Sequence, residues 1–149
     1  MSVGNDADLG TLEVIDKDEC FDLLRYQGIG RIAFHDDAKI VVFPINYQLI
    51  GHAVVFLTGD GSIWNTAIRH KDATFEVDES DGNFQTGWSV MVSGKLRIYE
   101  ELTDQNDMSR FTHRPWAKGA KQHAVTIEPH AVTGRVISHG IRPDIRWNI

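Results

Sequence analysis

Apolar and polar residues alternate most clearly between Gly87 and Glu100. One face of this stretch collects apolar side chains and the other collects polar ones, namely Trp88, Val90, Val92, Leu96 and Ile98 against Ser89, Ser93, Lys95 and Arg97. Successive side chains of a strand point to opposite faces, so this period of two predicts a half-buried strand. Gly94 falls on the apolar face and predicts a bend or a close backbone approach, as barrel corners need.

Two apolar segments further upstream predict a β-hairpin. The segments are GRIAFHDD and AKIVVFPINY, and the turn falls near Asp36 and Asp37. The run Ile40 to Phe43 is apolar on both faces, which predicts burial on both sides. Pro44 has no N–H to donate to a ladder, so it predicts a bulge, a strand end or a sheet edge.

A strand, a tight glycine-containing loop and a short helix follow Gly51 and His52. The strand ends at Thr58, and the helix runs from Ser62, a plausible N-cap, to about His70. The loop glycines allow a sharp turn, and the helix start offers free N–H groups and a favourable dipole to an anion. The stretch therefore predicts an anion site, although many turns of this kind bind nothing. A further strand covers about residues 74–79.

The two ends of the predicted domain carry a helix and a last strand. Asp16 precedes Glu19 by three positions, which resembles a capping box and predicts a surface helix over about 17–27. Its apolar stripe comprises Cys20, Phe21, Leu23 and Leu24. A second short helix is predicted over 103–111, and the last strand begins at His123 and resumes after Pro129.

These elements predict a mainly β fold. Six or seven strands, mostly antiparallel neighbours with short helices between them, favour a small β-barrel. We expect one domain over 13–138, between a flexible N-terminal tail at 1–12 and a C-terminal tail at 139–149.

Composition narrows the class of protein. The chain has 149 residues, 42% hydrophobic and 24% charged, which is typical of one globular domain. No apolar run approaches the ~20 residues that span a bilayer, and the N-terminus does not resemble a signal peptide. A single cysteine excludes an internal disulfide and favours a cytoplasmic location. The net charge of −6 with scattered basic residues argues against a nucleic-acid partner.

The titratable residues show no recognisable catalytic constellation. The seven histidines have no metal-binding spacing, and no serine or cysteine has a nucleophile's surroundings. Asp78 and Glu79 are adjacent, and adjacent strand residues point to opposite faces, so a solvated strand end is the favoured interpretation. Cys20 lies on the apolar stripe of its helix and is expected to be inert.

Several motifs together resemble one family. They are GIGRIAF after the first helix, PINY at Pro44–Tyr47, FEVDE at Phe75–Glu79, TGWSVMVSGK at Thr86–Lys95 and PWAKG at Pro115–Gly119. In this order they span about residues 12–137. The chain resembles the FMN-binding split β-barrels of the pyridoxamine 5′-phosphate oxidase-like family, in the branch that contains nitroimidazole-resistance proteins.

The resemblance implies a homodimer with FMN at the subunit interface. The strand at Pro44–Tyr47 would pass under the flavin ring, the loop from Thr58 would hold the phosphate, and a loop of the second subunit would complete the site. The implied cofactor-binding residues are Pro44, Ile45, Asn46, Thr58, Gly59, Gly61, Ser62, Trp88, Ser89 and Trp116. Without the resemblance, Trp88 on its apolar strand face would be interpreted as a core residue.

One position departs from the family pattern. The lysine that often follows the residue matching Ser62, and pairs with the phosphate, is Ile63 here. The nearest cations, Arg69 to Lys71, lie at the other end of the helix. The phosphate charge would then be met by backbone, by hydroxyls or by a distant Arg31. A deazaflavin is the alternative cofactor.

The resemblance makes a flavin-dependent oxidoreductase acting on a small molecule the first hypothesis. In such enzymes the cofactor carries the redox chemistry, which explains why no acid–base constellation stands out. The alternative is a non-catalytic barrel that binds a flavin, a deazaflavin or haem. A barrel without any ligand, acting as an interaction module, is the third hypothesis. The sequence identifies no catalytic residue.

Overall fold

The computed structural model describes residues 10–26, 28–101 and 123–138. The elements in this part of the chain are β1 (Thr11–Ile15), α1 (Lys17–Leu24), β2 (Ile29–Asp36), β3 (Lys39–Ile50), β4 (Ala53–Thr58), α2 (Ser62–Ile68), β5 (Asp72–Asp81), β6 (Thr86–Ile98) and β7 (His123–Ser138). The predicted helix at 103–111 and the loop that contains Trp116 lie outside the described residues.

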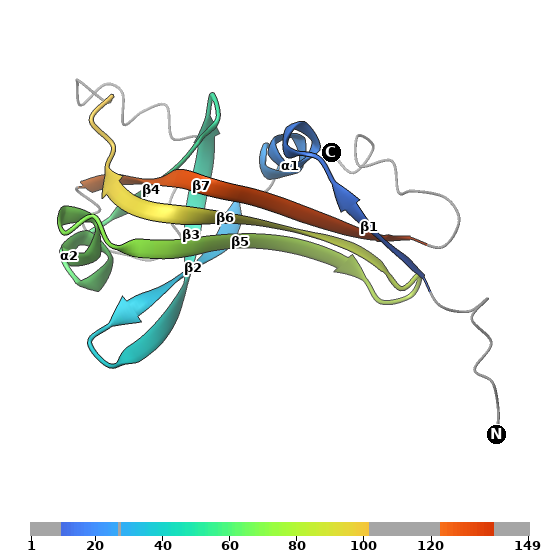
Figure 1. The fold of residues 1–149 in the computed structure, drawn as a ribbon, viewed down its shortest axis with the longest axis horizontal. Helices are drawn as coiled ribbons and strands as arrows, with labels where there is room; N and C mark the ends of the chain where they lie inside the picture. Colours follow the sequence, from blue (N-terminus) through green and yellow to red (C-terminus); the bar gives the residue numbers. More distant parts are fainter. Residues whose placement is uncertain (1–9, 27, 102–122, 139–149) are drawn as a thin grey trace.

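The strands form a closed antiparallel ring. Their order is β1-β7-β4-β3-β2-β5-β6, and β6 also pairs with β7, so strands β2 to β7 close on themselves. Strand β1 adds to the free side of the C-terminal half of β7. Figure 1 shows β5, β6 and β7 running out together from the ring toward β1. This topology confirms the prediction of a mainly β, antiparallel split barrel.

The interior is filled by the apolar side of the strands. Val90, Val92 and Leu96 of β6 are buried, as the period of two predicted. Gly94 lies where the register of β6 against β7 shifts, and a side chain there would meet the backbone of Glu128. The predicted close approach is therefore confirmed, and β7 continues through Pro129 at this irregularity.

Helix α1 covers the extended part of the sheet. The Asp16 side chain accepts a hydrogen bond of 2.9 Å from the backbone N–H of Glu19, so the predicted N-cap is present. The helix ends at Leu24, earlier than predicted, and its four apolar residues are buried. Burial raises the pKa of the Cys20 thiol to about 11, with the nearby carboxylates of Asp16 and Glu19 adding to the effect. The thiol is thus protonated near neutrality, as expected for an inert cysteine.

One prediction about β3 is wrong. The run Ile40 to Phe43 was expected to be buried on both sides, yet Ile40 is 69% exposed and Val42 57%. The reason is that only one face of the run meets the core, through Val41, whereas Ile40 and Val42 lie on the other face. The first half of β3 also pairs with β2 alone, because β4 pairs with β3 only from Tyr47 onward. Pro44 lies in this half, on the edge of β3 that β4 does not reach, so the sheet needs no N–H donor from it there. Of the three interpretations of Pro44, the sheet edge is the one confirmed.

Strand β1 is an element that the sequence pattern did not predict. It begins at Thr11, inside the stretch expected to be a flexible tail, and its Leu12 and Val14 are exposed. Neither of the two described helices is long and apolar enough to cross a membrane.

Candidate functional site

A cavity of about 380 Å³ lies between α2 and the β2–β3 turn. One face of the helix lines it with Ser62, Asn65, Thr66 and Arg69, the positions that share a face at helical spacing. The opposite wall comes from the β2–β3 turn, with His35, Asp36 and Asp37. Gly61, before the helix, and Lys71, after it, complete the lining. We call this space the α2 cavity.

The start of α2 differs from the sequence prediction. The N-cap is Gly61, with no side-chain cap, and Ser62 is the first helical residue, so the prediction of Ser62 as N-cap is wrong. Gly61 has a φ of 149°, a conformation that residues with a Cβ rarely adopt, and it lets the chain turn into the helix. The Thr66 hydroxyl donates to the Ser62 carbonyl at 2.7 Å, which fixes this first turn.

The cations of α2 lie closer to the predicted anion site than the sequence suggested. Arg69 and Lys71 were placed at the other end of the helix, yet both line the same cavity as Gly61 and Ser62. Ile63, at the position of the family's usual lysine, packs against the hydrophobic core. The α2 cavity therefore combines two cations and hydroxyl groups with the acidic side chains of the turn.

The loop before α2 is tied to the first residue of β7. His123 Nε2 lies 2.8 Å from Asp60 Oδ1, and the His123 ring stacks on Trp64 with ring centroids 3.8 Å apart and an angle of 4°. Thr58 pairs with His123 in the β4–β7 ladder and is buried. His123 thus fixes the position of the loop before α2.

The predicted ring-contacting segment of β3 is positioned by the last residue of α1 and by the chain that follows it. The Tyr47 hydroxyl donates to the Leu24 carbonyl at 2.7 Å, and the Asn46 side chain donates to the Gly28 carbonyl at 3.4 Å. Ile45 packs against the core, while Pro44 is exposed at the edge of the strand.

The outer surface of the barrel forms a second candidate region. Cross-strand register places Pro44 of β3 beside Arg31 of β2, then Glu76 of β5 and Met91 of β6. We call the side of the sheet that carries these residues the outer sheet face. Ser89 lies on it, one row along, whereas its neighbour Trp88 points to the other side and packs against the core.

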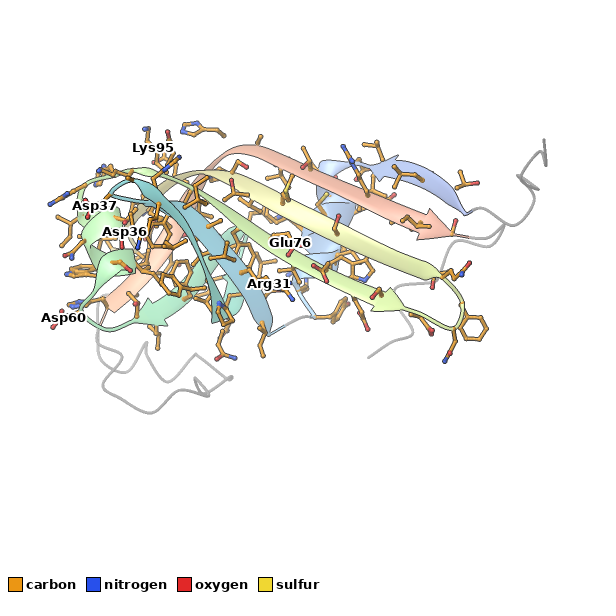
Figure 2. All side chains as sticks on the ribbon, turned by 90° about the horizontal axis from the view of Figure 1, so that it is seen from below. Arg31, Asp36, Asp37, Asp60, Glu76 and Lys95 are labelled. Carbon is orange, nitrogen blue, oxygen red and sulfur yellow. The ribbon has the colours of Figure 1, made fainter. Side chains whose placement is uncertain are left out.

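Arg31 does not line the α2 cavity but joins two carboxylates on the outer sheet face. Its Nη1 lies 3.2 Å from Glu76 Oε2 and 3.2 Å from Asp78 Oδ2. Figure 2 shows Arg31 and Glu76 together near the middle of the molecule, whereas Asp60 lies at one end of it. Sequence reasoning compared Asp78 with Glu79 and missed Glu76. The signal was available, because residues two apart on a strand share a face.

Burial raises the pKa of Glu76 to about 7, and the neighbouring Asp78 carboxylate adds to this through a shared hydrogen bond and repulsion. The Arg31 guanidinium acts in the opposite direction and does not offset the two. Glu76 thus exchanges a proton near neutral pH. Within the described residues, no group of three or more histidine, cysteine or acidic side chains could hold a metal ion.

A second cavity of about 380 Å³ lies at one end of the outer sheet face. Its lining is mainly apolar, from Ala33, Phe34, Ile40 and Ala73, with the hydroxyls of Thr74 and Ser93 hydrogen-bonded to each other at 3.1 Å. His35 lines both cavities, so the two are adjacent.

The implied site residues therefore fall into separate groups. Gly61 and Ser62 line the α2 cavity, whereas Thr58 ends β4, just before Gly59, and is not part of the lining. Pro44 and Ser89 share the outer sheet face, separated by β2 and β5. Trp116 lies outside the described part of the chain.

The chain is similar to known proteins in both sequence and structure. A model of the pyridoxamine 5′-phosphate oxidase family matches residues 16–136. An uncharacterised protein of Mycobacterium tuberculosis is 31% identical over 137 residues, which cover 87% of this chain and 88% of that protein.

Two solved structures share the fold. The FAD-binding protein of Mycobacterium smegmatis superposes with a TM-score of 0.62 at 28% identity, covering 85% of this chain and 98% of that one. A FAD-binding protein of Mesorhizobium loti gives a TM-score of 0.69 at 19% identity, with coverage of 87% and 98%.

The closed antiparallel ring and its solved counterparts define a split β-barrel protein. The match over residues 16–136 goes further, and the chain belongs to the pyridoxamine 5′-phosphate oxidase family. This confirms the resemblance found in the sequence motifs.

Proposed function

We propose that the protein binds FMN and holds its phosphate in the α2 cavity. The observation that carries this proposal is the convergence of Arg69 and Lys71 on the cavity that Gly61 and Ser62 open. Two cations and the hydroxyls of the cavity suit a phosphate group, which would compete with Asp36 and Asp37 of the opposite wall for these cations. The solved relative from Mycobacterium smegmatis, described as an FAD-binding protein, supports a flavin as the ligand.

In this proposal the flavin ring extends from the α2 cavity toward the exposed edge of β3. The β3 residues before Tyr47 do not pair with β4, so Pro44 lies on an edge of the strand that no described strand covers. Asn46 and Tyr47 hold this segment in place from behind. When bound, the flavin would supply hydride or electron transfer, and the protein would bind and orient it.

Replacing Arg69 by alanine is expected to weaken FMN binding about tenfold or more. A hydrogen bond to a charged group contributes roughly 1.5–3 kcal/mol, and ~1.4 kcal/mol is one decade in affinity. Riboflavin lacks the phosphate, so its affinity should not change. Isothermal titration of the wild-type protein, Arg69→Ala and Lys71→Ala with both ligands measures the difference, and the loss for FMN should shrink as salt rises.

Arg25→Ala is the matched control, because Arg25 is an exposed cation at the end of α1, outside the lining of the α2 cavity. An equal loss of FMN and riboflavin affinity in Arg69→Ala, or no loss for FMN, would contradict the phosphate position. Parallel titrations with FAD and a deazaflavin decide which flavin is preferred.

We also propose that the protein, with its flavin bound, is an oxidoreductase that acts on a small molecule. Native protein should be yellow, and mass spectrometry of the co-purifying molecule identifies the cofactor. Oxidation of a reduced nicotinamide in the presence of an electron acceptor would separate an enzyme from a flavin carrier. Haem absorption in place of flavin absorption would contradict the proposal. We place the protein in the cytoplasm, where a free cysteine stays reduced.

A homodimer completes the proposal. The outer sheet face carries exposed apolar side chains on four strands, among them Ile40, Val42, Met91, Ile137 and Val14. Exposed apolar patches of this kind mark association surfaces. A second copy on this face would also cover the region beside Pro44 and Ser89, where the resemblance puts the flavin ring.

A further inference from the structure

Arg31 forms a charged cluster with Glu76 and Asp78 of the FEVDE motif, and flavin binding does not explain this cluster. Arg31 Nη1 lies 3.2 Å from one oxygen of each carboxylate, Glu76 and Asp78. The register pairs Arg31 with Glu76 across β2 and β5, and Asp78 follows two positions along on the same face. One cation therefore serves two carboxylates, and the cluster carries one net negative charge unless it binds a proton.

The cluster is partly withdrawn from water already in the single chain. The exposed fractions of its side chains are 26% for Glu76, 47% for Asp78 and 55% for Arg31. Carboxylates this close share a proton readily, because two like charges at short distance are costly. The raised pKa of Glu76, about 7, agrees with this geometry.

No other charged group lies directly beside the pair on the described strands. On β6, Met91 is opposite Glu76 and Ser89 is opposite Asp78. Beyond them on β7 lie Thr133 and the cation Arg135, two strands away from the pair. On the other side, β3 presents Pro44 next to Arg31.

The remaining titratable groups of this face lie at its other end. His35 is four residues from Arg31 on β2, roughly 13 Å along the strand. His130 and the ion pair of Lys95 with Asp72 lie near the second cavity. The charge of the cluster therefore depends mainly on its own proton.

We propose that this proton controls the pairing of two copies of the chain through the outer sheet face. The inference rests on the homodimer of the proposed function. The apolar residues Val42 and Met91 flank the cluster, which makes a second copy of the same face a suitable partner. The neighbouring strands β3, β2, β5, β6 and β7 at ~4.8 Å spacing, over about ten residues, offer on the order of 600 Å², comparable with the about 800 Å² that one partner buries in a standard interface.

The direction of the effect follows from desolvation. Covering the cluster removes it from water, which favours its neutral, protonated form over the form with an unshared negative charge. Association then takes up protons, so the dimer is favoured below about pH 7 and weakens as pH rises through this value. Each subunit contributes at most one proton, so the limit is about a hundredfold in the dissociation constant per pH unit.

Sedimentation equilibrium of the full-length protein at pH 6 and pH 8, at constant ionic strength, tests the proposal. We expect the dissociation constant of the wild-type dimer to rise at least tenfold between the two values. Glu76→Gln keeps the shape of the side chain without its charge, so it should remove most of this dependence and leave a tight dimer at pH 8. Asp78→Asn, which frees Glu76 from its neighbour, should also reduce the dependence.

Glu79→Gln is the control, since Glu79 lies on the same strand but on the opposite face of the sheet. It should retain the full pH dependence. A wild-type dimer of equal strength at both pH values would overturn this inference while leaving the dimer in place. A monomer at both values would overturn the dimer as well, whereas the FMN titrations would still decide cofactor binding.

Discussion

Replacing Gly94 by alanine is expected to lower the free energy of unfolding by at least about 3 kcal/mol, at the upper end of overpacking effects. A Cβ at this position would overlap the carbonyl oxygen of Glu128 and lie 3.2 Å from the backbone nitrogen of His130. Both are backbone atoms of β7, and the β6–β7 ladder holds them in place. No side chain can swing away, so the two strands would have to separate at the bend. Urea denaturation measures the loss.

Gly82→Ala is the matched control for this prediction. Gly82 lies in the β5–β6 turn, and a Cβ there would have no atom within 4 Å. Its effect should stay within about 0.5 kcal/mol, as for most surface substitutions. Equal stability of the two variants would mean that β6 and β7 do not approach as closely as described.

Phe75→Ala is expected to cost about 3–5 kcal/mol of unfolding free energy, because it empties a fully enclosed site. The Phe75 ring is 0% exposed, contacts the Tyr47 ring edge-on at 4.9 Å and lies against Gly30, where a Cβ would come within 2.6 Å of it. Phe84→Ala removes the same group from a turn where it is 72% exposed and should have little effect. A comparable loss in both variants would contradict this account of the core.

The strands were predictable because their spacing is a local property. Alternation over β6 identified the buried residues, and Gly94 on the buried side of that strand predicted the close approach to β7. The N-cap at Asp16 needs only the three positions that follow it, so it too could be predicted. Strand β1 was missed because its Leu12 and Val14 face outward, and its pairing with β7 joins residues more than a hundred positions apart.

Predictions that depend on distant partners were less successful. The apolar run from Ile40 suggested two-sided burial, but Ile40 and Val42 are exposed on the outer sheet face. The FMN phosphate was expected to lack a nearby cation because Arg69 is seven positions from Ser62. A helix of that length returns to the same face, and the β2–β3 turn closes the space opposite. Only the folded chain shows that these residues share a cavity.

The charged cluster of Arg31, Glu76 and Asp78 was only partly predictable from the sequence. The sequence interpretation considered Asp78 with its neighbour Glu79, which points to the opposite face of the strand. The same alternation puts Asp78 and Glu76 on one face, because they are two positions apart. The pairing of Glu76 with Arg31 could not be predicted, since 45 residues separate them in sequence. A search for carboxylates two apart on predicted strands would have found the pair.

The position of β7 at the closure of the ring affects how the protein folds. Among the described strands, β7 pairs with β1, β4 and β6, so the ring cannot close until residues 123–138 are available. On the ribosome, β4 and β6 therefore keep an unpaired edge until residues 123–138 have been synthesised and have emerged. Pairings between such distant segments make folding slow, and we expect the nascent chain to depend on chaperones. A chain truncated before residue 123 should aggregate rather than form a smaller barrel.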